Sequence, residues 1–248
     1  MNKKISELFD YGDEIVVNDE TDMMFDPTEI KEMTMKKGLT EIVFILDKSG
    51  SMSGLEADTI GGYNSFLERQ KKGEGEAYVS TVLFSDRSAV IHDRVPIEKI
   101  EPMTDKQYYV DGCTALLDAI GGAIHHIGNV HKYAREEDRP EKTIFVITTD
   151  GQENASSEYS YEKIQKMVKR QTEKYGWEFI FLGANIDAFS EAERLGICRD
   201  RAVRYECDAV GTALNFSVLS ETICDVRRGK KMKKNWNAEI TEHYNKTN

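Results

Sequence analysis

The sequence contains few cysteines, and their spacing matches no common metal-binding or redox motif. Four cysteines occur in 248 residues, and no two of them form a C-x-x-C pair. Disulfide frameworks are typical of short secreted chains, so we expect reduced thiols in a cytoplasmic protein. The first residues, "MNKKISELFDYGDE", are basic but no apolar targeting region follows them, and no apolar run reaches the length of a membrane span. We therefore expect a soluble, cytoplasmic protein that does not bind membranes.

The sequence also lacks an excess of basic residues. It has 33 Lys and Arg against 44 Asp and Glu, a formal net charge of -11 at pH 7. An acidic surface repels the phosphate backbone of nucleic acids, so nucleic-acid binding is not expected. Divalent cations suit such a chain better.

The chain divides into three zones by composition. Residues 1–37 are predicted to form an acidic N-terminal extension, and residues 38–226 alternate strand and helix patterns. Residues 227–248 are basic at first and then polar, which is typical of a frayed helix end whose lysines face the solvent. A length of 248 residues allows one large core or two small ones, if a domain takes about 150 residues. The single alternating zone favours one domain.

Strands alternate with helices through the central zone, which predicts an α/β fold. Residues 40–47 and 142–150 are apolar runs rich in Ile and Val, as expected of strands that are buried on both faces. Two further runs flank Asp86 and Arg87, which predicts a hairpin and an antiparallel edge strand. Ser53 and Glu56 resemble a capping box at the start of a helix. We expect a mostly parallel central sheet with one antiparallel edge strand and helices on both faces.

Both of the most apolar strands end in an aspartate, Asp47 in "EIVFILD" and Asp150 in "IFVITTD". Parallel strands place both carboxylates at one edge of the sheet, where ligands of such folds bind. Ser49 and Ser51 follow Asp47, and Thr114 stands where a loop enters a helix. Each residue alone has a local explanation as a turn residue or a helix cap. Five oxygen-bearing side chains on three loops at one edge favour a common site.

This set of ligands suits a small, hard cation. Mg²⁺ prefers six oxygen ligands and takes few carboxylates, and Mn²⁺ or Ca²⁺ are compatible with the same donors. The hydroxyl groups of Ser49, Ser51 and Thr114 are neutral, so only Asp47 and Asp150 offset the charge of the ion. A bound ion would therefore keep positive charge and accept a carboxylate from another molecule.

The stretch "DKSGSMSG", the threonine of "GCTALLDAI" and the aspartate of "TTDG" resemble the von Willebrand factor A (vWA) domain and its metal-ion-dependent adhesion site (MIDAS). The family's Asp-x-Ser-x-Ser motif matches Asp47, Ser49 and Ser51, and its later threonine and aspartate match Thr114 and Asp150. The resemblance implies a Rossmann-like sheet wrapped by helices, with Mg²⁺ or another divalent ion at its edge. It further implies a cytoplasmic adaptor or assembly protein that grips an Asp or Glu of a partner protein. Cys113, next to Thr114, departs from the glycines that often precede the family's threonine.

An enzymatic alternative is a metal-dependent phosphatase or phosphotransferase of the haloacid-dehalogenase type, with Asp47 as the nucleophile. That chemistry requires a second aspartate two residues later as the general acid. Ser49 occupies this position, and a serine does not supply a proton at neutral pH. We therefore expect a binding protein and not an enzyme. No feature of the sequence indicates its oligomeric state.

Overall fold

The computed structural model describes residues 36–184 and 186–247. The predicted acidic extension, residues 1–37, therefore lies almost entirely outside the described residues. Within these described residues, six strands form one sheet in the order β3-β2-β1-β4-β5-β6, and only β3 runs antiparallel to its neighbour. The strands are β1 (Lys36–Asp47), β2 (Ala77–Phe84), β3 (Ser88–Pro96), β4 (Pro140–Thr149), β5 (Glu178–Gly183) and β6 (Ala202–Arg204).

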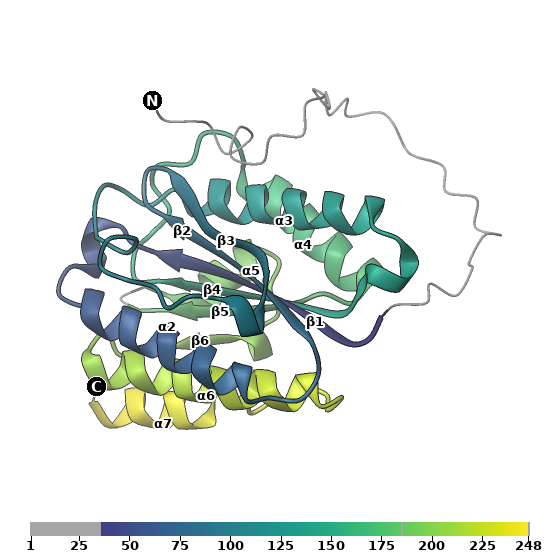
Figure 1. The fold of residues 1–248 in the computed structure, drawn as a ribbon. Coiled ribbons are helices and arrows are strands. Elements are labelled where there is room, and N and C mark those ends of the chain that lie inside the picture. The colour runs from purple at the N-terminus through teal and green to yellow at the C-terminus, as the bar shows by residue number, and fades with distance from the viewer. Residues whose placement is uncertain (1–35, 185, 248) are drawn as a thin grey trace.

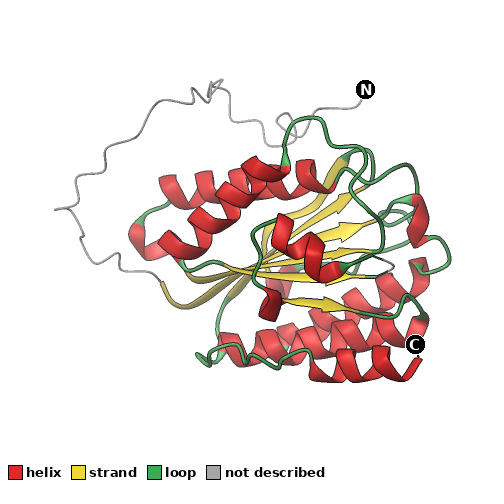
Figure 2. Cartoon of the chain, turned by 180° about the vertical axis from the view of Figure 1, so that it is seen from behind, coloured by secondary structure: helices red, strands yellow, loops and turns green. Residues whose placement is uncertain are grey.

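Helices cover both faces of the sheet (Figures 1 and 2). They are α2 (Glu56–Lys71), α3 (Leu116–Tyr133), α4 (Tyr161–Tyr175), α5 (Ala188–Arg194), α6 (Ala209–Arg227) and α7 (Ala238–Thr247). Helices α2, α6 and α7 pack on one face, and α3, α4 and α5 on the other. The arrowheads of the parallel strands point the same way in Figure 2, so their carboxyl ends form one edge of the sheet.

The central strand β1 shows why its sequence is a continuous apolar run. Phe44 and Leu46 belong to the core beneath α2 and α6, whereas Val43 and Ile45 belong to the core beneath α3 and α4. Because helices cover both faces, no position along this stretch is left to face water. The predicted α/β class, the parallel sheet and the antiparallel edge strand are confirmed.

The segment after α6 is more ordered than a frayed tail. Trp236 and Ile240 are buried against the same core as α2 and α6. The Trp236 indole N–H donates a hydrogen bond of 2.9 Å to the backbone carbonyl of Asp200. Two well-spaced apolar residues in a polar segment are a weak sequence signal, so only the tertiary packing identifies α7 as part of the domain.

The predicted capping box at Ser53 is wrong in its details. Helix α2 begins at Glu56, its N-cap is Leu55, and no side chain caps it. The Glu56 carboxylate does turn back, to accept a hydrogen bond of 2.8 Å from the backbone N–H of Gly54. Ser53 instead ends the short 3-10 turn Gly50–Met52, because the chain first has to turn around the edge of the sheet.

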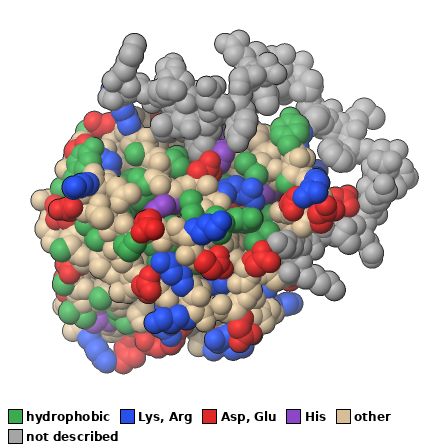
Figure 3. All heavy atoms as spheres, in the orientation of Figure 1, with side chains coloured by type: hydrophobic (Ala, Val, Ile, Leu, Met, Phe, Trp, Pro, Cys, Tyr) green, Lys and Arg blue, Asp and Glu red, His purple; other side chains and the backbone are tan. Residues whose placement is uncertain are grey.

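The outer surface is mixed in character. On the face shown in Figure 3, basic and acidic side chains are interspersed and hydrophobic side chains form separate spots.

Within the described part of the chain, no helix has the length and apolar character needed to cross a membrane. None of the four cysteines forms a disulfide; they are Cys113, Cys198, Cys207 and Cys224.

Candidate metal site

The candidate site lies at the carboxyl edge of the sheet, where β1 and β4 end side by side. Asp47 is the last residue of β1, and Asp150 directly follows β4. The two strands are paired in parallel as far as Leu46 and Thr148, so both aspartates leave the sheet as neighbours. Their exposed fractions are only 0% and 3%. Two buried carboxylates this close together disfavour each other's charge unless a cation or a proton offsets it.

The two predicted serines bridge these aspartates. The Ser51 hydroxyl donates a hydrogen bond of 2.6 Å to Asp150 Oδ1, and Ser49 Oγ lies 3.1 Å from Ser51 Oγ. The backbone N–H of Ser49 donates a bond of 2.7 Å to Asp47 Oδ1. The loop after β1 therefore extends to the end of β4, and Ser49 and Ser51 connect the two carboxylates through hydrogen bonds.

Thr114 reaches the same space from a third loop, as the surroundings of Gly151 show. A methyl group placed on the Cα atom of Gly151 would lie 3.0 Å from Thr114 Oγ1 and 3.2 Å from Ser51 Oγ. The same methyl group would lie 3.8 Å from Ser49 Oγ. All three hydroxyl groups thus surround one small volume that the missing side chain of Gly151 leaves open. The structure brings the five predicted residues together.

The Asp47 carboxylate is held by donors on both of its oxygens. Besides the bond from Ser49, the Thr149 hydroxyl donates a bond of 2.6 Å to Asp47 Oδ2. Burial raises the pKa of Asp47, and the charge of Asp150 adds to this, although both hydrogen bonds act in the opposite direction. The buried Tyr108 hydroxyl donates a hydrogen bond of 2.6 Å to the Asp47 backbone carbonyl and so holds the end of β1 in place.

Asp150 is held less firmly. Its Oδ1 accepts the Ser51 hydrogen bond, and its Oδ2 faces the Cys207 thiol at 3.8 Å. Burial raises the pKa of Asp150 despite these two donors. A thiol is a weak donor, so Oδ2 is the carboxylate oxygen of the cluster with the weakest hydrogen bond.

The loop that follows Asp150 is fastened to the start of α3. Thr114 and Asn154 form two reciprocal hydrogen bonds, of 2.9 Å from the Thr114 N–H and 3.0 Å from the Asn154 N–H. Glu153 accepts a bond of 2.9 Å from the N–H of Leu117. The Asp118 carboxylate accepts three further bonds of 2.9 Å from backbone N–H groups of residues 157–159. Asp118 therefore faces this loop from a buried position.

The loop before Thr114 is fastened to the end of β1. Lys48 and Asp111 form an ion pair of 2.5 Å, and the same carboxylate accepts a bond of 2.7 Å from the Ser85 hydroxyl. The N–H of Gly50 donates a bond of 3.1 Å to the carbonyl of Gly112. These contacts hold the serine loop and the threonine loop in a fixed relation to each other.

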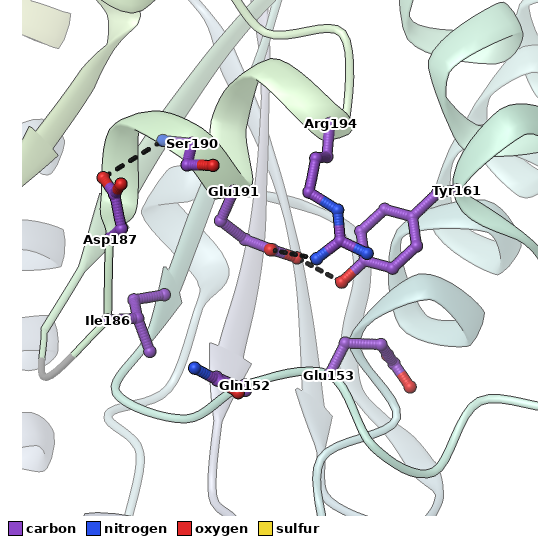
Figure 4. A pocket seen from close by; sticks show the side chains of 8 residues that line it. All are labelled: Gln152, Glu153, Tyr161, Ile186, Asp187, Ser190, Glu191 and Arg194. Carbon is purple, nitrogen blue, oxygen red and sulfur yellow. Dashed lines mark hydrogen bonds and ion pairs between the residues drawn. The ribbon is translucent and has the colours of Figure 1, made fainter.

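A hollow of about 230 Å³ opens beside this edge (Figure 4). Its wall begins at Gln152, two residues after Asp150, and continues along α5. The one buried carboxylate in it, Glu191, is already engaged, because Tyr161 donates a bond of 2.5 Å and Arg194 one of 3.0 Å. The lining residues are Gln152, Glu153, Tyr161, Ile186, Asp187, Ser190, Glu191 and Arg194.

Chemically, the cluster is an oxygen site of two carboxylates and three alcohols. Such donors suit a hard divalent cation. No group of three or more His, Cys, Asp or Glu side chains positioned to hold a metal occurs in residues 36–184 and 186–247. The two carboxylates of the cluster are therefore too few to coordinate a metal ion by themselves. An ion bound there also needs the hydroxyl groups as ligands.

Sequence reasoning did not identify the residues that support the site. Asn154 accepts a hydrogen bond from the Thr114 N–H, Thr149 donates one to the Asp47 carboxylate, and Asp111 accepts one from the Ser85 hydroxyl. Their partners are 40, 102 and 26 residues away along the chain, so no local spacing marks them. The hydroxyl of Thr149, which directly precedes Asp150, was the one available signal.

Comparisons with known proteins place the fold. No protein-family model matches the chain, and no curated protein matches it. One similar structure is proximal thread matrix protein 1 from the mussel byssus, solved with a zinc-occupied MIDAS motif. The match covers 77% of this chain and 46% of the mussel protein, with 18% identity and a TM-score of 0.53. The vWF domain of the type V pili tip protein Mfa5 from Porphyromonas gingivalis is also similar. The match covers 81% of this chain and 99% of the Mfa5 domain, with 11% identity and a TM-score of 0.54.

The pilus adhesin SpaC from Lactobacillus rhamnosus GG matches 75% of this chain and 30% of its own, with 13% identity and a TM-score of 0.54. The chain thus spans less than half of the mussel protein and less than half of the adhesin. At these identities the likeness concerns the fold, and the fold is that of a vWA domain.

Proposed function

We propose that this protein binds a divalent metal ion at the cluster and uses it to hold an Asp or Glu side chain of a partner protein. The ion is Mg²⁺, with Mn²⁺ or Ca²⁺ as alternatives, and its ligands are Asp47, Ser49, Ser51, Thr114 and Asp150, directly or through water. The protein acts as a cytoplasmic adaptor or assembly factor without catalysis. The observation that carries the proposal is the convergence of three hydroxyl groups beside Gly151, between two buried aspartates.

The charges of the cluster support a cation. The nearest basic side chain along the sequence, Lys48, is paired with Asp111 and not with Asp47 or Asp150. The pKa values of both site aspartates are raised by burial, so their ionised forms are poorly compensated in the absence of an ion. A divalent ion would supply the missing positive charge.

The same charges support an acidic partner group. Three of the five donors are neutral alcohols, and Asp47 already accepts two hydrogen bonds. The positive charge of an ion held in this way is only partly offset, and a carboxylate is the complementary ligand. Tyr109 is 54% exposed beside Lys48, where it would contact the partner. Among proteins with this fold, the mussel protein has a zinc-occupied MIDAS motif and SpaC is a pilus adhesin.

The burial of Asp47 favours binding over covalent catalysis. A nucleophilic aspartate must present one oxygen to its substrate, but Asp47 has no exposed surface and both of its oxygens accept hydrogen bonds. Ser49, in the position of the required general acid, has only a hydroxyl group and supplies no proton at neutral pH. The phosphotransferase alternative therefore requires the end of β1 to rearrange.

Calorimetric titration of Mg²⁺, Mn²⁺ and Ca²⁺ tests the proposal. The wild type should take up one ion, Asp47→Ala should take up none, and Glu162→Ala, a change on the exposed face of α4, should match the wild type. Equal uptake by the Asp47 and Glu162 variants would contradict the assigned ligands. Partner capture that survives a chelator would contradict the role of the metal. Phosphatase turnover abolished by Asp47→Asn would establish the enzymatic alternative instead.

A further inference from the structure

The turn between β2 and β3 lies beside the candidate metal site, although the proposed function gives it no role. Strand β2 ends at Phe84, which is paired with Asp47 at the end of β1. Because the two strands are parallel, the turn leaves the sheet at the same edge as the aspartate. Ser85 and Asp86, the first two residues of the turn, contact the loop that carries Thr114.

Three consecutive backbone N–H groups fix this loop at Thr114. The N–H of Cys113 donates a hydrogen bond to Asp86 Oδ1. The N–H of Ala115 donates one of 2.8 Å to the Ser85 carbonyl. The N–H of Thr114 itself donates one of 2.9 Å to a side chain of the loop after β4. The turn therefore holds the residue on each side of Thr114, while the loop after β4 holds Thr114.

The loop passes so close to the Asp86 carboxylate that only a glycine fits at position 112. Gly112 has a φ of 66°, in the left-handed region that favours glycine. A methyl group on its Cα atom would lie 2.5 Å from Asp86 Oδ1. The hydrogen bond from Cys113 to Asp86 is exposed, so water can replace the acceptor and the bond should contribute little to stability. Its main effect is on the backbone that leads into Thr114.

We propose that Asp86 is a positioning residue of the metal site, which holds the backbone next to Thr114 and thereby keeps the threonine hydroxyl beside Gly151. The Thr114 hydroxyl forms no hydrogen bond with the described residues, so its position depends on the backbone. Ser51, in contrast, is also placed by its hydroxyl, which donates to Asp150. The inference rests on the proposed function, because Thr114 is one of the proposed ligands. It gives the antiparallel edge of the sheet a part in setting the metal affinity.

Calorimetric Mg²⁺ titration of the full chain tests this inference. Asp86→Ala should lower Mg²⁺ affinity about 10- to 100-fold, the loss typical when a residue that supports a metal ligand is removed. Asp86→Asn keeps an acceptor oxygen for the Cys113 N–H and should stay within about threefold of the wild type. Asp105→Ala removes the same charge from an exposed position earlier in the same loop and should match the wild type.

Two further measurements separate positioning from a purely structural role. The thermal midpoint of metal-free Asp86→Ala should fall by no more than about 4 °C, as expected for the loss of one exposed hydrogen bond. Hydrogen exchange of the Cys113 amide should be faster than in the wild type in Asp86→Ala, and unchanged in Asp86→Asn.

Equal losses of affinity in Asp86→Ala and Asp86→Asn would assign the effect to charge, and a much larger fall of the thermal midpoint would assign it to the fold. Either result would overturn this inference. Wild-type affinity in Asp86→Ala would also overturn it, and would leave the proposed function intact. A wild type that takes up no divalent ion would overturn the proposed function as well.

Discussion

Thr114 and Asn154 hold each other by two reciprocal hydrogen bonds: the Thr114 N–H donates one of 2.9 Å to the Asn154 side-chain Oδ1, and the Asn154 N–H donates one of 3.0 Å to the Thr114 carbonyl. One residue begins the approach to α3 and the other lies in the loop after β4, so this pair joins two of the three loops of the site. It keeps the Thr114 hydroxyl beside Gly151 without occupying the hydroxyl itself.

Asn154→Ala should weaken metal binding. The change leaves the Thr114 N–H without its side-chain acceptor, and removal of such a supporting partner typically lowers metal affinity by about 10- to 100-fold. Calorimetric Mg²⁺ titration measures the effect. Asn154→Asp keeps an acceptor oxygen and should recover most of the affinity, while Gln152→Ala in the same loop should have little effect. An Asn154→Ala variant with wild-type affinity would show that this clamp does not position the site.

Gly151→Ala should also weaken metal binding, for a steric reason. The added methyl group would lie 3.0 Å from Thr114 Oγ1 and 3.2 Å from Ser51 Oγ, so the hydroxyl groups must move apart. We expect at least about a tenfold loss of Mg²⁺ affinity, comparable to the loss of a supporting contact. Gly61→Ala is the matched control, because nothing lies within 4 Å of its added methyl group. Equal Mg²⁺ affinities in the two variants would place the ion elsewhere.

Asp47→Asn should remove metal binding without lowering the stability of the metal-free protein. Burial raises the pKa of Asp47, so the ionised carboxylate costs folding free energy at neutral pH, and the neutral amide avoids that cost. In the wild type, Mg²⁺ at a hundred times its dissociation constant should add about 2.7 kcal/mol to the free energy of unfolding. Thermal unfolding with and without Mg²⁺ measures both effects. A metal-free variant that melts well below the wild type would contradict the argument.

A second buried carboxylate, Glu41, should control stability in acid. It has no exposed surface, and it accepts bonds from Arg94 at 2.8 Å and from His131 at 2.9 Å. Burial alone would raise the pKa of Glu41, but these two partners outweigh it and hold the pKa below its usual value of 4.5. Its contribution is therefore present above the unfolded-state pKa of 4.5 and is lost as the pH falls through the lower folded-state value.

Glu41→Gln should accordingly destabilise the protein by about 3 kcal/mol at pH 7, because Arg94 and His131 lose their shared partner in a buried place. The difference from wild type should shrink as the pH falls below 4.5. Urea unfolding at several pH values measures both. Glu162→Gln, which removes a fully exposed partner of Lys166, should cause no measurable loss. A pH-independent difference would show that packing and not charge explains the cost.

The charge cluster around Glu41 illustrates what local sequence patterns miss. Its members lie 53 and 90 residues from Glu41 along the chain. Arg94 also has a φ of 48°, in the left-handed region that non-glycine residues rarely adopt. A glutamate inside a run of apolar strand residues resembles a solvent-facing position, and only the sheet neighbours and α3 show that it is buried.

The sequence by itself determined the sheet and the composition of the candidate site. Continuous apolar runs predict strands that are buried on both faces, because both faces are covered by helices and shielded from water. Parallel pairing then puts the ends of β1 and β4 at one edge of the sheet. The resemblance in "DKSGSMSG", "GCTALLDAI" and "TTDG" then selected the five oxygen-bearing residues.

The tertiary structure decided how those residues are held, which residues support them and where the chain after α6 packs. Hydrogen bonds between loops, such as Thr114 to Asn154, and weak contacts, such as Cys207 to Asp150, depend on distances between segments far apart in sequence. Local propensity carries no information on such distances, because they arise only when the whole core has packed.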